Sequence, residues 1–266
     1  MSDDWPFGRT LAHRGSGRAE DGVFPENTFE AVAFAFLLGL PSENDYTLTR
    51  DGVVVAMHNL TIEETTNGRG AVRQHTLAEL RELDAGGWHS AKYVGLTIPT
   101  LEELVTLAND KQGSMIFEGK GPDGEEHLTG HCIASEVSDR WTGNRPKLFS
   151  SFQLDVLAGM AEGAPDSLRA LNLGKPDEWP EDWFQDARSL GCTTIVAEHD
   201  DLPDPLIRDL RRRGMWVAPY CDYDYHVGDD GPDVGRRLHH RPEEVERLFA
   251  AGANAVFMDA LHPFMR

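Results

Sequence analysis

An alternation of short apolar runs with helical stretches constrains the fold of this chain more than any other feature. Apolar runs typical of short strands recur along the sequence, and segments with helical spacing separate many of them. Counted from Thr10, the pattern contains eight strand-and-helix units, which predicts a (β/α)8 TIM barrel of the α/β class. A chain of 266 residues suits one barrel of about 250 residues. We therefore expect a single domain over residues 1–266.

The predicted elements follow from apolar spacing and capping residues. The predicted strands are Thr10–Ala12, two runs on either side of the Asp51-Gly52 turn, Ser114–Lys120, Leu148–Phe152, Leu168–Leu173, Thr193–Ala197, Met215–Pro219 and Ala255–Met258. The predicted helices are Thr28–Gly39, Glu125–Trp141 with Leu128, Cys132, Val137 and Trp141 inward, Asp182–Leu190, Asp204–Arg213 and Glu243–Ala251.

One segment interrupts the alternation. Residues from about 59 to 99 contain many turn residues and few apolar repeats. We therefore expect a small insertion after the second strand region. Within it, Thr76–Leu83 has the pattern of a short capped helix, and residues 86–100 are predicted to form a lid. The inserted segment is thus predicted to act as a cap on the barrel.

The stretch from His13 to Thr28 is predicted to lie where a strand ends and a helix begins. Loops at the carboxyl ends of barrel strands carry the ligand chemistry of such folds. His13 supplies a proton-transfer group and Arg14 a permanent cation, a combination that suits a phosphate ester. The alternative is that His13 only caps a strand and Arg14 pairs with Glu26.

Two further pairs place charged side chains on one strand face. Glu43 and Asp45 are two residues apart, so both carboxylates share a face and repel each other unless a cation lies between them. A hard divalent ion with oxygen ligands, Mg²⁺ or Ca²⁺, is the simplest candidate, and a solvated strand edge is the alternative. Glu118 and Lys120 have the same spacing, and a plain salt bridge is the alternative there.

The formal net charge of −20 limits the partners of the chain. Nucleic acid and anionic membrane surfaces bind clustered Lys and Arg, so neither is expected as a partner. An anionic small-molecule substrate would be repelled by the chain as a whole. A site for such a substrate therefore needs its own positive potential, from a metal ion and a few basic residues.

Neither a membrane span nor a disulfide framework is expected. The longest apolar run, Ala31–Leu40, is about half of what a span needs. The N-terminus has no basic start and no apolar core typical of a secretory signal, which favours a cytoplasmic protein. Cys132, Cys192 and Cys221 are odd in number and widely spaced, which argues against disulfides and a zinc site.

The order of these features resembles the glycerophosphodiester phosphodiesterase family. His13-Arg14-Gly15 followed by Pro25-Glu26-Asn27-Thr28 is similar to the opening signature of that family. A Glu-x-Asp pair, an Asp-Gly turn, a strand ending at His58 and a later Glu-x-Lys then follow in the order of the family pattern. The resemblance covers Thr10–Glu103 well, 118–152 moderately and the remainder only as a fold.

The resemblance implies a role for each of these side chains. Glu43, Asp45 and Glu118 would hold a divalent metal ion, while Arg14 and Lys120 would bind the substrate phosphate. His13 and His58 would be the general acid and general base, in an order that the sequence leaves open. The implied substrate is a small glycerophosphodiester, hydrolysed to glycerol 3-phosphate and an alcohol.

The chain departs from the family pattern at several positions. Asn59 follows His58 where the family has Asp, and Glu64 replaces an Arg, so the surroundings of the histidine differ in charge. Tyr220 stands where the family commonly has a Trp-Thr-x-Asn block, and it is predicted to form an apolar wall of the substrate pocket. A polar loop through residues 226–241 follows it. Asp259 matches a closing Asp that we interpret as mainly structural, and Ser150 and Ser151 are expected to support the site by hydrogen bonding.

Two other functions remain open at this stage. A cyclising phosphodiesterase, similar to phospholipase D toxins, would use the same barrel, histidines and metal ion. A non-catalytic barrel that binds phosphodiesters is the second, since Asn59, Glu64 and the missing Trp suggest decay. The alcohol of the substrate, the identity of the metal ion and the oligomeric state do not follow from the sequence.

Overall fold

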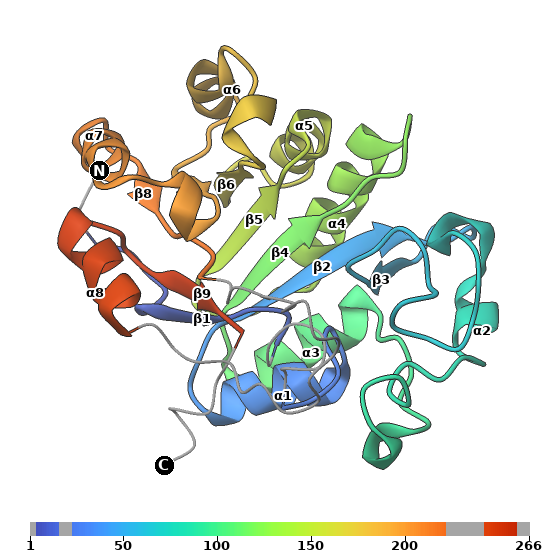
Figure 1. Ribbon diagram of the computed structural model, residues 1–266. Coiled ribbons are helices and arrows are strands. Elements are labelled where there is room, and N and C mark those ends of the chain that lie inside the picture. The colour runs from blue at the N-terminus through green and yellow to red at the C-terminus, as the bar shows by residue number, and fades with distance from the viewer. Residues whose placement is uncertain (1–3, 16–22, 222–241, 260–266) are drawn as a thin grey trace.

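Parallel strands form a closed barrel at the centre of the molecule (Figure 1). The computed structural model describes residues 4–15, 23–221 and 242–259. A parallel bridge between Tyr220 and Phe257 joins the two ends of the sheet and closes the ring. The predicted (β/α)8 barrel is therefore confirmed. In order around the barrel, the strands are β8 (Trp216–Val217), β7 (Thr194–Val196), β6 (Leu168–Asn172), β5 (Lys147–Ser151), β4 (Met115–Gly119), β2 (Ser42–Leu48), β1 (Thr10–Ala12) and β9 (Val256–Met258).

The interior of the barrel is apolar in its lower part and polar at the carboxyl ends of the strands. Because side chains alternate between the two faces of a strand, every second residue points inward. Buried apolar residues fill the interior, among them Leu11, Ile116, Leu148, Ala170, Ala218 and Phe257. The residue two positions after each of these six apolar residues is polar. These polar residues are His13, Glu118, Ser150, Asn172, Tyr220 and Asp259. A polar layer thus covers the apolar core at one end of the barrel.

Helices pack around the outside of the sheet (Figure 1). A second apolar cluster, which includes Tyr46, Leu104, Phe117 and Phe149, fills the space between strands and helices. The helices are α1 (Phe29–Leu37), α3 (Leu101–Lys111), α4 (Glu126–Arg140), α5 (Leu154–Gly163), α6 (Trp183–Ser189), α7 (Asp204–Arg212) and α8 (Pro242–Ala251).

Local sequence explains where several helices begin and end. Thr28 caps α1 as predicted, because its hydroxyl accepts from the Ala31 N–H at 3.3 Å. Gly39 follows α1 with a φ of +73°, a conformation that suits glycine at a helix end. Two features differ from the sequence prediction. Helix α5 was not among the predicted helices, and the inward orientation of Leu128 is wrong because its side chain is 48% exposed.

A hairpin leads into the inserted segment. Strand β3 (Val54–Ala56) pairs antiparallel with β2, as predicted around the Asp51-Gly52 turn. The segment continues through the 3-10 turns η2 (Val72–Gln74) and η3 (Ala91–Tyr93) and the short helix α2 (Leu77–Leu80). Thr76 caps α2 in a capping box with Glu79, although the helix is shorter than the predicted range. The segment shares a buried cluster with β3 and the residue after it: Val55, Met57, Ile62, Val72, Leu80, Ala85 and Ile98. Its role as a cap stays a prediction.

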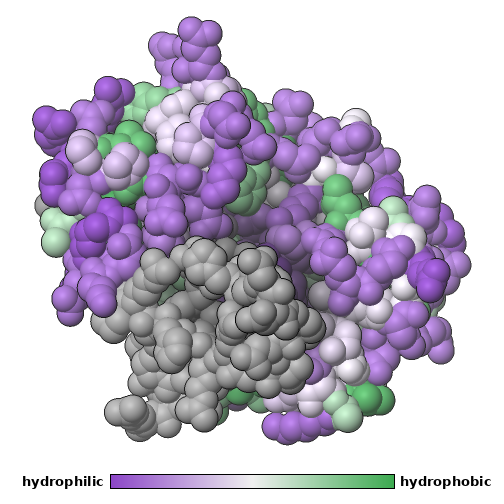
Figure 2. Space-filling view, viewed as in Figure 1, coloured by the Kyte–Doolittle hydropathy of each residue, from purple (hydrophilic) through white to green (hydrophobic). Residues whose placement is uncertain are grey.

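The surface is mostly hydrophilic on the face seen in Figure 2, where apolar groups are small and scattered. Within the described ranges, no helix is both long and apolar enough to cross a membrane.

Candidate active site

Three buried carboxylates converge at the carboxyl end of the barrel. Glu43 and Asp45 come from β2 and Glu118 from the neighbouring β4, where Asp45 and Glu118 are register partners. One ligand atom from each lies within 4.8 Å of the others, and all three side chains are buried. The predicted sharing of a strand face is the reason for this convergence, because parallel neighbours present equivalent positions at the same height.

Hydrogen bonds from the first loop hold two of these carboxylates. The backbone N–H of Arg14 donates to Glu43 Oε2 at 3.0 Å. The side-chain amide of Asn27 donates to Asp45 Oδ2 at 2.9 Å, while its oxygen accepts from the Asp45 N–H at 3.1 Å. Asn27 has a φ of +58°, a conformation that asparagine tolerates better than most residues. The loop that precedes α1 therefore positions the acidic side chains of β2.

Tyr220 and Asn172 hold the third carboxylate from across the barrel. The Tyr220 hydroxyl donates to Glu118 Oε2 at 2.8 Å, and the Asn172 amide donates to the same oxygen at 2.9 Å. Burial and then the charge of Glu118 raise the pKa of Tyr220 well above its usual value. The tyrosine is therefore a neutral hydrogen-bond donor. Its buried position fits the predicted wall, but its hydroxyl faces a carboxylate, which the sequence did not indicate.

Two cations lie against the carboxylates. Lys120 Nζ is 2.7 Å from Glu118 Oε1 and 3.3 Å from Asp45 Oδ1. Arg14 forms an ion pair with Glu26 at 2.8 Å, which is the alternative considered from the sequence, and its Nε is also 3.7 Å from Asp45 Oδ2. Both basic residues are therefore at the site, and both are engaged with acidic side chains there.

The charges of the site shift the ionisation of its members in opposite directions. Burial, together with the nearby charge of Asp45, raises the pKa of Glu43 to about 8. Burial also disfavours ionisation of Asp45, but Lys120 and His58 outweigh it and hold the pKa of Asp45 well below its usual range. Without a further cation, one of the two β2 carboxylates thus keeps a proton near neutral pH.

His13 is oriented by a carboxylate from the last strand. Its Nδ1–H donates to Asp259 Oδ1 at 2.6 Å, and its Nε2 lies 3.9 Å from Glu43 Oε2. Burial alone would lower the pKa of His13, but Asp259 outweighs burial and raises it to about 9. Asp259, interpreted from the sequence as mainly structural, therefore contacts a candidate catalytic side chain.

His58 has a neutral partner instead. It follows β3, and its Nδ1–H donates to Asn59 Oδ1 at 2.6 Å. An amide oxygen can only accept, so Nδ1 carries the proton and Nε2 keeps its lone pair. Burial lowers the pKa of His58 below its usual value, and the cations Arg14 and Lys120 act in the same direction. The substitution of Asn for Asp thus gives the second histidine a hydrogen bond without a charge.

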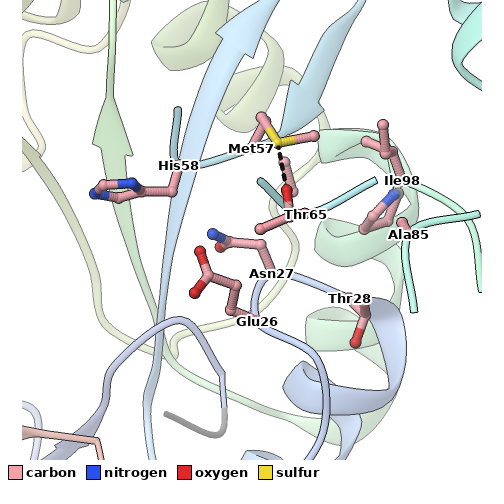
Figure 3. A pocket seen from close by; sticks show the side chains of 10 residues that line it. Glu26, Asn27, Thr28, Met57, His58, Thr65, Ala85 and Ile98 are labelled. Carbon is pink, nitrogen blue, oxygen red and sulfur yellow. Dashed lines mark hydrogen bonds between the residues drawn. The ribbon is translucent and has the colours of Figure 1, made fainter. Parts of the chain in front are cut away.

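The inserted segment packs closely behind His58. Figure 3 shows a pocket between the loop before α1, the end of β3 and the inserted segment, with His58, Glu26 and Asn27 among its lining residues. The Thr65 hydroxyl donates to Met57 Sδ across this region at 3.3 Å. The cavity has a volume of about 10 Å³, which is space for one water molecule. The segment therefore supports the histidine as a packed layer.

The carboxylate cluster fits a hard divalent cation. Among the described residues, no hydrogen-bond donor reaches the buried atom Glu43 Oε1. Carboxylate oxygens are the ligands that Mg²⁺ and Ca²⁺ prefer, and three of them converge here. Glu43, Asp45 and Glu118 are therefore the residues of this chain that could hold such an ion.

Other predicted positions have different outcomes. Ser151 donates its hydroxyl to the Gly119 carbonyl at 2.7 Å, as expected of a supporting residue, whereas Ser150 Oγ is buried without a partner in the described part of the chain. Glu64 is exposed on the inserted segment. The polar loop at residues 226–241 lies outside the described residues. In a second cluster, His199, Asp200 and Glu244, the Glu244 carboxylate forms an ion pair with Arg247.

Known proteins match most of the length of this chain. The model of the glycerophosphoryl diester phosphodiesterase family matches residues 13–262. A glycerophosphodiester phosphodiesterase of Caldanaerobacter subterraneus subsp. tengcongensis is 43% identical over 259 residues, which cover 94% of this chain and 93% of that protein. A Bacillus subtilis protein of the same name is 32% identical over 226 residues, 79% of this chain and 75% of its own. A solved phosphodiesterase of Oleispira antarctica, in complex with the product sn-glycerol-3-phosphate, superposes with a TM-score of 0.82 at 26% identity, covering 97% of this chain and 95% of that one.

Proposed function

The chain belongs to the glycerophosphoryl diester phosphodiesterase family and is a phosphodiesterase, and from this premise we propose that it hydrolyses a glycerophosphodiester to glycerol 3-phosphate and an alcohol. A divalent cation, Mg²⁺ or Ca²⁺, and two histidines would carry the reaction. The Oleispira antarctica phosphodiesterase that this barrel resembles was solved with sn-glycerol-3-phosphate as its product, which supports the proposed product here.

The observation that carries the proposal is the convergence of unlike groups in one polar layer. Glu43, Asp45 and Glu118 offer ligand atoms within 4.8 Å of one another, and Lys120 Nζ contacts two of these carboxylates. His13 lies at the edge of the same cluster, with its Nε2 3.9 Å from Glu43. Plain salt bridges would not require two histidines with different partners at the same place.

The site must attract an anion although the chain carries a formal charge of −20. A bound divalent cation would supply positive charge to the phosphoryl oxygens as negative charge develops there. Lys120 and Arg14 would add two permanent cations beside the same oxygens. The carboxylates that now engage these cations would be shared with the metal ion, which leaves Lys120 and Arg14 able to contact the phosphate.

The hydrogen-bond partners of the histidines support a division of labour. His13 donates from Nδ1 to the carboxylate of Asp259, an arrangement that stabilises the imidazolium and suits a general acid. His58 keeps a lone pair on Nε2, which suits a general base. In this scheme His58 takes a proton from a water molecule, the water oxygen bonds to phosphorus, the bond between phosphorus and the alcohol oxygen breaks, and His13 protonates the departing alkoxide.

The test is turnover of glycerophosphocholine, glycerophosphoethanolamine and bis(p-nitrophenyl) phosphate with Mg²⁺, Ca²⁺ or EDTA. We expect metal-dependent release of glycerol 3-phosphate from the glycerophosphodiesters, lost by about 100-fold or more in His13→Ala and in Glu43→Ala. His127→Ala is the matched control, because this exposed histidine on α4 lies outside the site, and it should keep full activity.

Two results would contradict the proposal. A cyclic phosphate detected by phosphorus NMR as the final product would favour a cyclising enzyme. Absence of turnover with every metal, combined with a metal-dependent rise in melting temperature that Glu43→Ala abolishes, would favour a barrel that binds phosphodiesters without catalysis.

A further inference from the structure

Each of the three carboxylates has one oxygen held by hydrogen bonds and one oxygen left for a cation. In Glu43, Oε2 accepts from the Arg14 N–H, and no donor of the described residues reaches Oε1. In Asp45, Oδ2 accepts from Asn27, and Oδ1 is 3.3 Å from Lys120 Nζ. The two atoms of each carboxylate therefore have different surroundings.

Glu118 shows this asymmetry most strongly. Its Oε2 accepts two hydrogen bonds, from the Tyr220 hydroxyl at 2.8 Å and from the Asn172 amide at 2.9 Å. Its Oε1 has no such donor and contacts Lys120 Nζ at 2.7 Å. Asp45 Oδ1 contacts the same ammonium group, so one cation already lies between these two oxygens of Asp45 and Glu118.

The two donors to Glu118 are themselves fixed in place. Asn172 ends β6 and is 2% exposed, and Tyr220 follows β8 and is 6% exposed. The tyrosine ring packs between His13 and Phe257, with ring centroids 5.0 Å and 4.7 Å apart. A second hydrogen bond of 3.3 Å joins the Asn172 amide to the Tyr220 oxygen. Rotation of the Glu118 carboxylate would break two buried hydrogen bonds, so its orientation is set from outside the cluster.

This arrangement bears on which cation the cluster prefers. Ca²⁺ accepts many oxygen ligands and often binds a carboxylate through both oxygens, whereas Mg²⁺ requires octahedral geometry and keeps several water molecules. A carboxylate oxygen has two lone pairs, and both on Glu118 Oε2 are already used by hydrogen bonds. Only Oε1 remains available, so Glu118 is restricted to contact through one oxygen.

We propose that Tyr220 and Asn172 are positioning residues that hold Glu118 as a single-oxygen ligand and thereby favour Mg²⁺ over Ca²⁺. The inference rests on the proposed function, because it takes the three carboxylates as ligands of a divalent cation. The inference gives the Tyr220 hydroxyl a role separate from that of the ring. The hydroxyl determines which oxygen of Glu118 can bind the metal ion.

The experiment is isothermal titration calorimetry of metal-free protein with Mg²⁺ and, separately, with Ca²⁺, in the absence of substrate. Tyr220→Phe removes one donor and keeps the ring, and Asn172→Ser shortens the second donor as an independent variant. Tyr46→Phe is the matched control, because Tyr46 is also buried but its hydroxyl has no hydrogen-bond partner among the described residues. The melting temperature of each metal-free variant reports whether it is folded.

We expect the wild type to bind Mg²⁺ more tightly than Ca²⁺. Tyr220→Phe should lower the Mg²⁺ affinity by about tenfold, as is usual for loss of a hydrogen bond to a metal ligand, and the Ca²⁺ affinity by less. Tyr46→Phe should leave both affinities unchanged. Equal losses for the two ions in Tyr220→Phe and Asn172→Ser, or no loss, would overturn this inference while the metal site stands. A wild type that binds neither ion would instead overturn the proposed metal role itself.

Discussion

The two candidate catalytic histidines have the same side chain and opposite surroundings. His13 donates to the buried carboxylate of Asp259, whereas His58 donates to the neutral amide of Asn59. A carboxylate stabilises the imidazolium form, and an amide oxygen fixes the ring without adding charge. Two residues that do not themselves react thus determine which histidine carries a proton near neutral pH.

Removal of the charge on Asp259 should therefore move the pH dependence of activity. Asp259 raises the pKa of His13 to about 9, so His13, the proposed general acid, stays protonated up to about that pH in the wild type. In Asp259→Asn the effect of burial is opposed only by the nearby charge of Glu43, so the pKa of His13 falls, and the protonated fraction at neutral pH falls with it. We expect a loss in kcat of up to about 100-fold at pH 8, and a basic limb of the pH–rate profile that begins at lower pH.

The profile itself distinguishes a change in His13 from general damage. Asp139→Asn, the same substitution at an exposed position of α4, should leave both kcat and the profile unchanged. A uniform loss of activity across the pH range in Asp259→Asn, with an unmoved basic limb, would contradict this role of Asp259.

The sequence predicted which candidate side chains come together better than it predicted the residues that orient them. Glu43 and Asp45, like Glu118 and Lys120, are two positions apart, and that local spacing determines which face they share. The contact between His13 and Asp259 joins residues 246 positions apart, and the contact between Tyr220 and Glu118 spans 102. Local spacing contains no information on such pairs, because the closure of the barrel brings them together. The pairing of His58 with Asn59 was accessible, since the two are neighbours in sequence.

Helices α4 and α5 also show that local sequence patterns do not predict contacts between distant parts of the chain. The glycines at positions 159 and 163 weaken the helical signal of α5, which sequence patterns did not predict. In the structure these helices approach so closely that a Cβ on Gly130 would lie 2.0 Å from the Val156 carbonyl oxygen. The close approach also sets which side of α4 is buried, and it leaves Leu128 exposed. The position of α5 determines which face of α4 is buried. The apolar periodicity of α4 alone could not predict that face.

Gly130→Ala separates close packing from helix propensity because the two effects have opposite signs. Alanine is favoured over glycine within a helix by about 1 kcal/mol, so propensity alone predicts a more stable protein. The clash with the Val156 carbonyl instead forces α4 and α5 apart, and we expect a net loss of about 1–3 kcal/mol in the free energy of unfolding. Urea denaturation measures it. Asp139→Ala, on the exposed side of the same helix, should change stability by less than about 0.5 kcal/mol. Unchanged or increased stability of Gly130→Ala would mean that the helices are not in such close contact.

At the scale of the whole molecule, local and overall electrostatics oppose each other. The formal charge is −20, yet Lys120 and Arg14 lie within the acidic layer at the barrel mouth and a divalent cation is proposed there. Fields from distant charges act over a Debye length, whereas contacts within the buried site are screened much less. Salt should therefore weaken the repulsion of an anionic substrate by the chain more than it weakens attraction within the site.

Activity on an anionic substrate should consequently increase with ionic strength. Raising ionic strength from about 0.01 M to about 0.15 M shortens the Debye length from about 30 Å to about 8 Å. With the metal ion held at saturation, we expect kcat/KM for bis(p-nitrophenyl) phosphate, which carries one negative charge, to rise by a factor of about 2 to 5. Glycerophosphocholine has no net charge, so its kcat/KM should change much less and serves as the control. If kcat/KM for the anion falls as salt is added, the positive groups at the mouth govern the approach of substrate and the charge of the chain as a whole does not.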